Sequence, residues 1–192
     1  IAASSGAIVP SGTATQEIVP LPVVNERPTS PVVGSKIKYK GTYVSPETDD
    51  VDARNQKELN FSLEEAKMIA EINPQMLSLR ELYTVALSYT EDKARFYKII
   101  NISVKLYPVH PVANLNAAAV ALSMKDLNTA VKFMEKADHA TAEFLNNTGV
   151  YNFLNGDIQR AKAAFEQAAK MGNETAQANL QQLQQILNMK MK

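Results

Sequence analysis

An ungapped internal match is the feature that most constrains what this chain can fold into. The stretch GDIQRAKAAFEQA at 156–168 aligns with KDLNTAVKFMEKA at 125–137, so that Asp157 matches Asp126. An aspartate, two alanines and one large apolar residue recur at the same places in both copies. A more divergent copy, DKARFYKIINIS at 92–103, precedes the middle one, and its Asp92 matches Asp126. The copies are offset by 31 and 34 residues. A period near 34 that carries helical spacing predicts a solenoid of stacked helix pairs.

The residues of the last copy have a physical logic. Ala161 and Ala168 are small enough to let two helices approach closely, and Phe165 would fill the space between adjacent pairs. We expect Gly149 where its helix meets the next one backbone to backbone. Gly156 tolerates a left-handed turn and precedes an aspartate, which predicts a helix end followed by a new N-cap.

The chain divides by composition into residues 1–56 and residues 57–192. Six of the nine prolines and four of the seven glycines lie within positions 1–50, so helices are not expected there. Within this part, SKIKYKGTYV at 35–44 alternates as a strand with one solvated, lysine-lined face does. One interpretation is an extended linker that lies on its neighbour. The other is the tail of an upstream β domain, or a strand offered to a partner's sheet.

The second part carries explicit helix boundaries. Ser62 with Glu65, and Ser78 with Glu81, form two capping-box patterns, and the proline of Asn73-Pro74 separates them. Only short breaks interrupt the helical spacing further on, which predicts antiparallel neighbouring helices. The chain would close with a terminal helix whose inward stripe is Leu180, Leu183, Ile186 and Leu187.

Several of these positions carry a resemblance to a known family. The region 77–175 resembles tetratricopeptide repeats, with departures at Phe96, Thr148 and Asn152 and a shortened middle copy. The resemblance implies a mainly α fold: a right-handed helical-hairpin solenoid of about three pairs plus a capping helix, with an extended, β-prone N-terminal arm. The residues that carry it are Gly149, Ala161, Phe165, Ala168 and the closing Pro108.

The resemblance also implies a binding surface, because the first helix of each pair lines the concave groove in that family. Asn116 and Asn147 are separated by the same interval as Asp126 and Asp157, and would occupy the same place in successive copies. An asparagine ladder there can hold the backbone of an extended peptide through paired amide hydrogen bonds. The alternative is that these asparagines satisfy local helix ends or face water. The resemblance adds Val85, Leu115, Ala119, Val150 and Phe153 to the groove.

Composition and motifs argue against catalysis and several kinds of ligand. Twenty basic and twenty acidic residues cancel, which disfavours a protein built to bind nucleic acid. Cysteine is absent from the sequence, and the two histidines, His110 and His139, lie far apart without a partner motif, so we expect neither metal nor cofactor. No apolar run reaches the roughly 20 residues of a membrane-spanning helix. We therefore expect no enzyme.

The sequence thus predicts a non-catalytic adaptor or scaffold that binds a peptide or partner protein in a helical groove. The alternative is a structural spacer or assembly subunit of a fimbria-like surface complex, which contacts its partners through the N-terminal arm. Residues 57–190 more loosely resemble the C-terminal helical region of Bacteroidetes envelope and OmpA-associated proteins. That resemblance implies a periplasmic or outer-membrane-associated protein rather than a cytoplasmic one.

Overall fold

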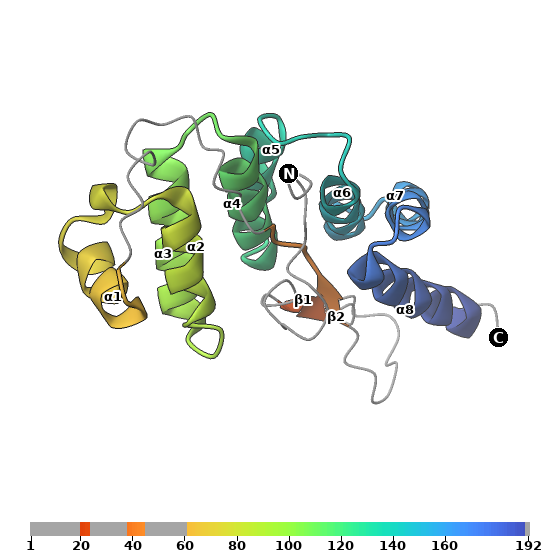
Figure 1. Ribbon diagram of the computed structural model, residues 1–192. Coiled ribbons are helices and arrows are strands. Elements are labelled where there is room, and N and C mark those ends of the chain that lie inside the picture. The colour runs from red at the N-terminus through yellow and green to blue at the C-terminus, as the bar shows by residue number, and fades with distance from the viewer. Residues whose placement is uncertain (1–19, 24–37, 45–60, 191–192) are drawn as a thin grey trace.

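The computed structural model of the chain describes residues 20–23, 38–44 and 61–190 (Figure 1). This part is mainly helical, as predicted, with eight α-helices, one 3-10 turn and two short strands. The boundary predicted at 56/57 falls among residues 45–60, outside the described residues. In chain order the elements are β1 (Pro20–Val23), β2 (Lys38–Lys40), α1 (Leu63–Ile72), η4 (Pro74–Met76), α2 (Leu79–Leu87), α3 (Lys93–Leu106), α4 (Pro111–Ser123), α5 (Leu127–Met134), α6 (Ala142–Leu154), α7 (Ile158–Lys170) and α8 (Glu174–Lys190).

The helices follow one another across the molecule, from α1 at the left of Figure 1 to α8 at the right. Each helix from α1 to α8 packs on the next one along the chain, and α4 also contacts α6 directly. The strands β1 and β2 pair antiparallel, with Pro20 opposite Lys40 and Val23 opposite Lys38. This small ribbon contacts α4, α6 and α8, so segments far apart in the sequence lie side by side.

The first two helices begin where the capping boxes predict. Ser62 accepts a hydrogen bond from the Glu65 N–H at 3.3 Å, and the Glu65 carboxylate accepts one from the Ser62 N–H at 2.8 Å. Ser78 and Glu81 repeat this exchange at 3.1 and 2.8 Å. Each box satisfies two backbone groups that a helix start would otherwise leave open.

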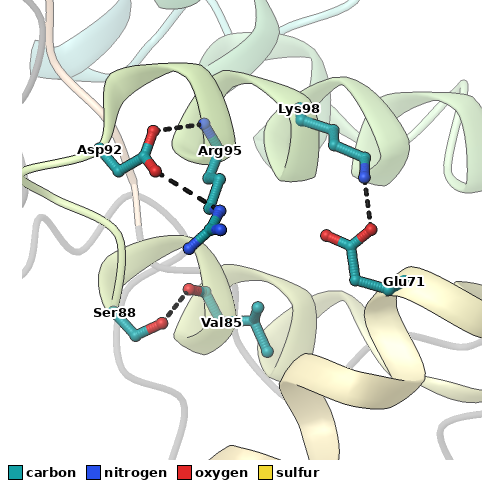
Figure 2. Close-up of polar contacts among 6 residues, drawn as sticks. All are labelled: Glu71, Val85, Ser88, Asp92, Arg95 and Lys98. Atoms are coloured by element: carbon teal, nitrogen blue, oxygen red, sulfur yellow. Dashed lines mark hydrogen bonds and ion pairs between the residues drawn. The ribbon is translucent and has the colours of Figure 1, made fainter.

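Three aligned aspartates cap α3, α5 and α7 in the same way. Asp92, Asp126 and Asp157 each accept a hydrogen bond from the backbone N–H three residues on, at 3.0 to 3.1 Å. Figure 2 shows the first of them, where the Asp92 carboxylate also pairs with the side chain of Arg95, 3.4 Å away. The aspartates recognised in the sequence as recurring therefore have one structural role, which is to cap the first turn of a helix.

The same helix-ending turn occurs at three places. Lys125, Gly156 and Gly172 have positive φ angles of 60°, 84° and 90°. In each case the next residue donates to a carbonyl five residues back, as the Asp157 N–H does to the Asn152 oxygen at 2.8 Å. These are Schellman-type ends. The turn predicted at Gly156 is confirmed, and Lys125 adopts the same conformation with a side chain that disfavours it.

The expectation for Gly149 was wrong in its detail. A Cβ atom added to Gly149 would lie 2.4 Å from two carbon atoms of the Phe165 ring, not against a neighbouring backbone. Both residues are buried, and α6 packs closely on α7. The glycine therefore leaves space for an aromatic ring, which is why a large residue at 165 and no side chain at 149 occur together.

Two large hydrophobic clusters form the core. The N-terminal cluster lies among α1 to α4 and includes Phe96, Ile100 and, from outside the helices, Tyr43. An ion pair between Glu71 of α1 and Lys98 of α3 spans its surface (Figure 2). The C-terminal cluster lies among α4 to α8. The inward stripe predicted for α8 is confirmed there, with Leu183 and Ile186 buried and Leu180 and Leu187 packed partly buried beside them.

Candidate functional site

Residues 40–44, here called the arm segment, lie against the helices, and all but Lys40 are buried. Thr42, Tyr43 and Val44 have no exposed surface, and Gly41 is also buried. The segment is extended: Lys40 ends β2, and the next four residues continue without helix or turn. Buried extended backbone needs partners for its N–H and C=O groups. For Lys40, Thr42 and Val44, side chains of α4, α6 and α8 supply those partners.

Two asparagines each hold one residue of the arm segment by both backbone groups. The Asn116 Oδ1 accepts from the Val44 N–H at 2.7 Å, and its Nδ2 donates to the Val44 oxygen at 2.8 Å. Asn147 bonds Thr42 in the same way, at 2.6 and 3.1 Å. Both asparagines are buried, and both bond residues that are remote from their own helices in sequence. The alternative that they satisfy local helix ends or face water is therefore wrong.

A third rung is supplied by Asn179 of α8, which the sequence reasoning missed. Its Oδ1 accepts from the Lys40 N–H at 3.0 Å, and its Nδ2 donates to the Lys40 oxygen at 2.9 Å. Asn146 adds a bond to the same oxygen at 3.0 Å, and its own Oδ1 accepts from Asn179 at 2.9 Å. Asn179 follows Asn147 by one residue more than the interval that separates Asn147 from Asn116, so a search that allowed a shift of one residue would have found it.

The geometry follows from two periodicities. Alternate residues of an extended chain point the same way, and the asparagines hold Lys40, Thr42 and Val44. The three asparagines occupy the same place in their helices, since each is the sixth residue of α4, α6 or α8. An asparagine side chain carries a C=O beside an N–H₂, so each rung presents the groups that a neighbouring β-strand would present. We call this surface of α4, α6 and α8 the asparagine face.

Side chains of the arm segment also contact the helices. The Tyr43 ring meets the Phe96 ring edge-on, with centroids 5.2 Å apart at 90°. Val44 lies in a small cluster with Leu115 and neighbouring apolar residues. A Cβ atom on Gly41 would lie 3.4 Å from that of Ala119. The segment is thus held by its backbone and packed by its side chains.

The remaining predicted groove residues are not all brought together. Leu115 and Ala119 lie beside the arm segment. Val85 belongs to the N-terminal cluster that also contains Tyr43. Val150 and Phe153 belong to the C-terminal cluster, and Val150 has no exposed surface. The family resemblance, from which these five positions were taken, did not distinguish residues that face the segment from residues that face the next helix.

Burial is the main cause of the pKa shifts of the titratable groups in this region. Burial raises the pKa of Glu143, in the first turn of α6, and the nearby charge of Asp138 raises it further. Burial also raises the pKa of Tyr43 well above its ordinary value, with smaller contributions from Tyr97 and Tyr83. Neutral forms are favoured where water is excluded. The asparagine face itself contacts the backbone of the arm segment through neutral amides.

The histidines have structural contacts. His110 is the N-cap of α4, where its Nδ1 accepts a hydrogen bond from the Val112 N–H at 3.2 Å. The His139 ring stacks on Phe144 with centroids 4.3 Å apart. Within the described ranges, no group of three histidine, aspartate or glutamate side chains is arranged to hold a metal ion. None of the helices described here is both long enough and apolar enough to cross a membrane.

Comparison of the chain with protein-family models, with curated proteins and with solved structures gives no match. The family resemblance therefore stays a prediction from the sequence.

Proposed function

We propose that this protein is a non-catalytic interaction module whose asparagine face binds extended polypeptide backbone. The observation that carries the proposal is the asparagine ladder, in which each of three side chains bonds both the N–H and the C=O of one residue. Such rungs depend on an extended backbone at alternate residues and not on a charge. In this chain the occupant is its own arm segment, so a partner's segment would have to displace it.

The recurring caps and turns support the solenoid on which the proposal draws. The aligned Asp92, Asp126 and Asp157 cap α3, α5 and α7, and the asparagines occupy one position in α4, α6 and α8. Repeated pairs of this kind place equivalent side chains in a row along one face. We propose that this face is the concave groove of a tetratricopeptide-like, right-handed solenoid closed by α8.

The test is an exchange experiment on the folded full chain. A protease site inserted between residues 50 and 51 allows the chain to be cut after folding, so that both pieces remain present. A fluorescent label on the N-terminal piece then reports its release by anisotropy. A synthetic peptide of residues 35–45 should compete with this piece for the asparagine face and accelerate its net release.

N-methylated peptides distinguish recognition of the backbone from nonspecific binding. Methylation of the Thr42 or Val44 nitrogen removes a donor that Asn147 or Asn116 binds, and should lower competition by at least about tenfold. Methylation at the intervening Tyr43 nitrogen is the matched control and should be tolerated better. Equal competition by all three peptides, or none by the unmodified one, would contradict the proposal.

One observation favours a second candidate, a spacer or assembly subunit that contacts partners through residues N-terminal to the arm segment. Thr42, Tyr43 and Val44 are completely buried, and Tyr43 is part of the main core. An occupant held this firmly would be a permanent part of the fold. A cut chain whose N-terminal piece does not exchange over days would favour this candidate.

Deletion separates the two candidates further. Removing residues 1–37 keeps the arm segment and should leave folding intact, whereas removing residues 1–50 also removes the core side chain Tyr43. If the shorter deletion abolishes assembly with partners while the helical circular dichroism is unchanged, the spacer is favoured. We propose that either activity is located in the periplasm or at the outer membrane, because residues 57–190 resemble Bacteroidetes envelope proteins.

A further inference from the structure

We propose that the asparagine face also selects side chains, and that its ligand class is an extended segment in which a glycine, a threonine or serine, an aromatic residue and an aliphatic residue follow one another. The inference rests on the proposed function and names its ligand. The arm segment supplies the pattern, as Gly41, Thr42, Tyr43 and Val44. Each of these four residues meets a different constraint from the helices.

The first position is tight for any side chain. A Cβ atom on Gly41 would lie 3.3 Å from the Asn147 Oδ1 and 3.4 Å from the Ala119 Cβ. The same Asn147 oxygen accepts the Thr42 N–H, so it cannot move away without lengthening that hydrogen bond. An alanine would need small shifts of its neighbours, and a β-branched residue would add atoms where contact already exists.

The second position is read by a hydrogen bond. The Asn146 Nδ2 donates to the Thr42 Oγ1, and both residues are completely buried. The other three positions of the pattern make no comparable side-chain hydrogen bond among the described residues. Replacing the hydroxyl by a methyl group would place an apolar surface against a buried amide donor, which costs binding free energy.

The third position accommodates an aromatic ring but offers no hydrogen-bond partner to its hydroxyl group among the described residues. Tyr43 packs edge-on against Phe96, yet its hydroxyl oxygen is buried and meets no hydrogen-bond partner in the part of the chain that the structure describes. A phenylalanine would keep the ring contact and lose the unpaired polar group. The fourth position is apolar, because Val44 lies with Leu115 and Val112.

The pattern also fixes the register of the segment. A shift by one alternate position in one direction would place Tyr39 where Gly41 now lies, against Ala119, and would leave only a glycine beside Phe96. The first change adds a ring where a Cβ atom is already crowded. The second leaves an apolar cavity in the core.

A shift in the other direction fails for a different reason. It would bring Tyr43 against Ala119, and it would place Pro46 at Asn116. A proline has no N–H to donate to the Asn116 oxygen. Side chains therefore decide which three residues of an extended chain reach the three asparagines.

The experiment uses the cut full chain, with competing peptides of residues 35–45 that differ in one side chain. We expect Gly41→Val and Tyr43→Ala to weaken competition by at least about tenfold, and Thr42→Val by about fivefold. The matched controls are Thr42→Ser and Tyr43→Phe. We expect the serine peptide to compete within about twofold of the parent and the phenylalanine peptide to compete at least as well.

The outcomes separate this inference from the proposed function. If all peptides compete equally, the backbone is recognised but side chains are not selected, and the inference is overturned alone. If the unmodified peptide does not compete, the proposed function fails as well. The same substitutions in the uncut chain give an independent readout, since urea midpoints should fall for Gly41→Val, Thr42→Val and Tyr43→Ala but not for Tyr43→Phe. Equal midpoints in all four variants would also overturn the inference.

Discussion

The Asn147 side chain bonds both the N–H and the C=O of Thr42, a residue 105 positions earlier in the chain, at 2.6 and 3.1 Å. One side chain thereby replaces a neighbouring strand for that residue. Both residues are completely buried, so neither backbone group has access to water as a substitute partner. The consequence is that loss of the amide is costly.

The first prediction concerns that amide. Asn147→Ala should lower the free energy of unfolding by roughly 2–4 kcal/mol, because it leaves a buried N–H and a buried C=O without their partner. Urea denaturation followed by circular dichroism measures this. Asn128→Ala, on the exposed side of α5, is the matched control and should change stability by no more than about 0.5 kcal/mol. Similar losses in the two variants would contradict the role of the ladder.

A second prediction concerns the contact between Gly149 and Phe165. Gly149→Ala should destabilise the fold by about 1–3 kcal/mol, because the added methyl group would overlap the ring. The double variant with Phe165→Leu should lose less than the sum of the two single changes, since the smaller side chain makes room. Strict additivity in thermal denaturation would show that the two residues do not share this space.

The left-handed turn at Lys125 should be improvable. Lys125→Gly is expected to stabilise the protein by about 0.5–1 kcal/mol, because glycine adopts the observed φ of 60° without the steric cost that lysine carries. Lys136→Gly, also exposed but without a positive φ, serves as control and should not stabilise. A lower melting temperature for Lys125→Gly than for the parent would refute this explanation.

Two buried tyrosines should respond oppositely to loss of the hydroxyl group. The Tyr83 hydroxyl oxygen has no hydrogen-bond partner among the described residues, whereas the Tyr107 hydroxyl donates to the Leu77 carbonyl at 3.2 Å. We therefore expect Tyr83→Phe to leave stability unchanged or raise it by about 1 kcal/mol, and Tyr107→Phe to lower it by about 1 kcal/mol. Chemical denaturation of both variants under one condition decides, and the reverse order would count against these contacts.

The fifth prediction concerns pH. Burial raises the pKa of Glu143 above its ordinary value of 4.5, so the folded chain holds this proton more tightly than the unfolded chain does. The unfolding free energy should then fall as the pH rises from about 4.5 through the raised pKa, because the folded state must accept a buried charge.

Glu143→Gln tests this assignment, since the amide cannot ionise. The variant should be more stable than the parent at about pH 7.5, and the difference should shrink toward about pH 4. Glu135→Gln removes a carboxylate from an exposed position and is the matched control for the loss of one charge. A parent whose stability relative to Glu143→Gln stays flat across this range would show that Glu143 is not the responsible group.

Local chemistry made much of the helical framework predictable. The serine–glutamate boxes at Ser62 and Ser78, the capping aspartates and the turn at Gly156 act over a few residues, and the structure confirms them. The spacing of Asn116 and Asn147 likewise predicted equivalent positions for them, and each is the sixth residue of its helix. The caps and turns were readable because the groups that satisfy them are neighbours in sequence.

What only the tertiary structure decided is which groups meet across the chain. Nothing local to SKIKYKGTYV shows that Thr42 and Val44 bond to asparagines 105 and 72 residues later. The contact between the Phe165 ring and Gly149 could not be predicted from the sequence either. Such contacts are set by the packing of several helices at once. The sequence by itself therefore determined the helices and the spacing of the asparagines, and the tertiary structure decided what those asparagines hold.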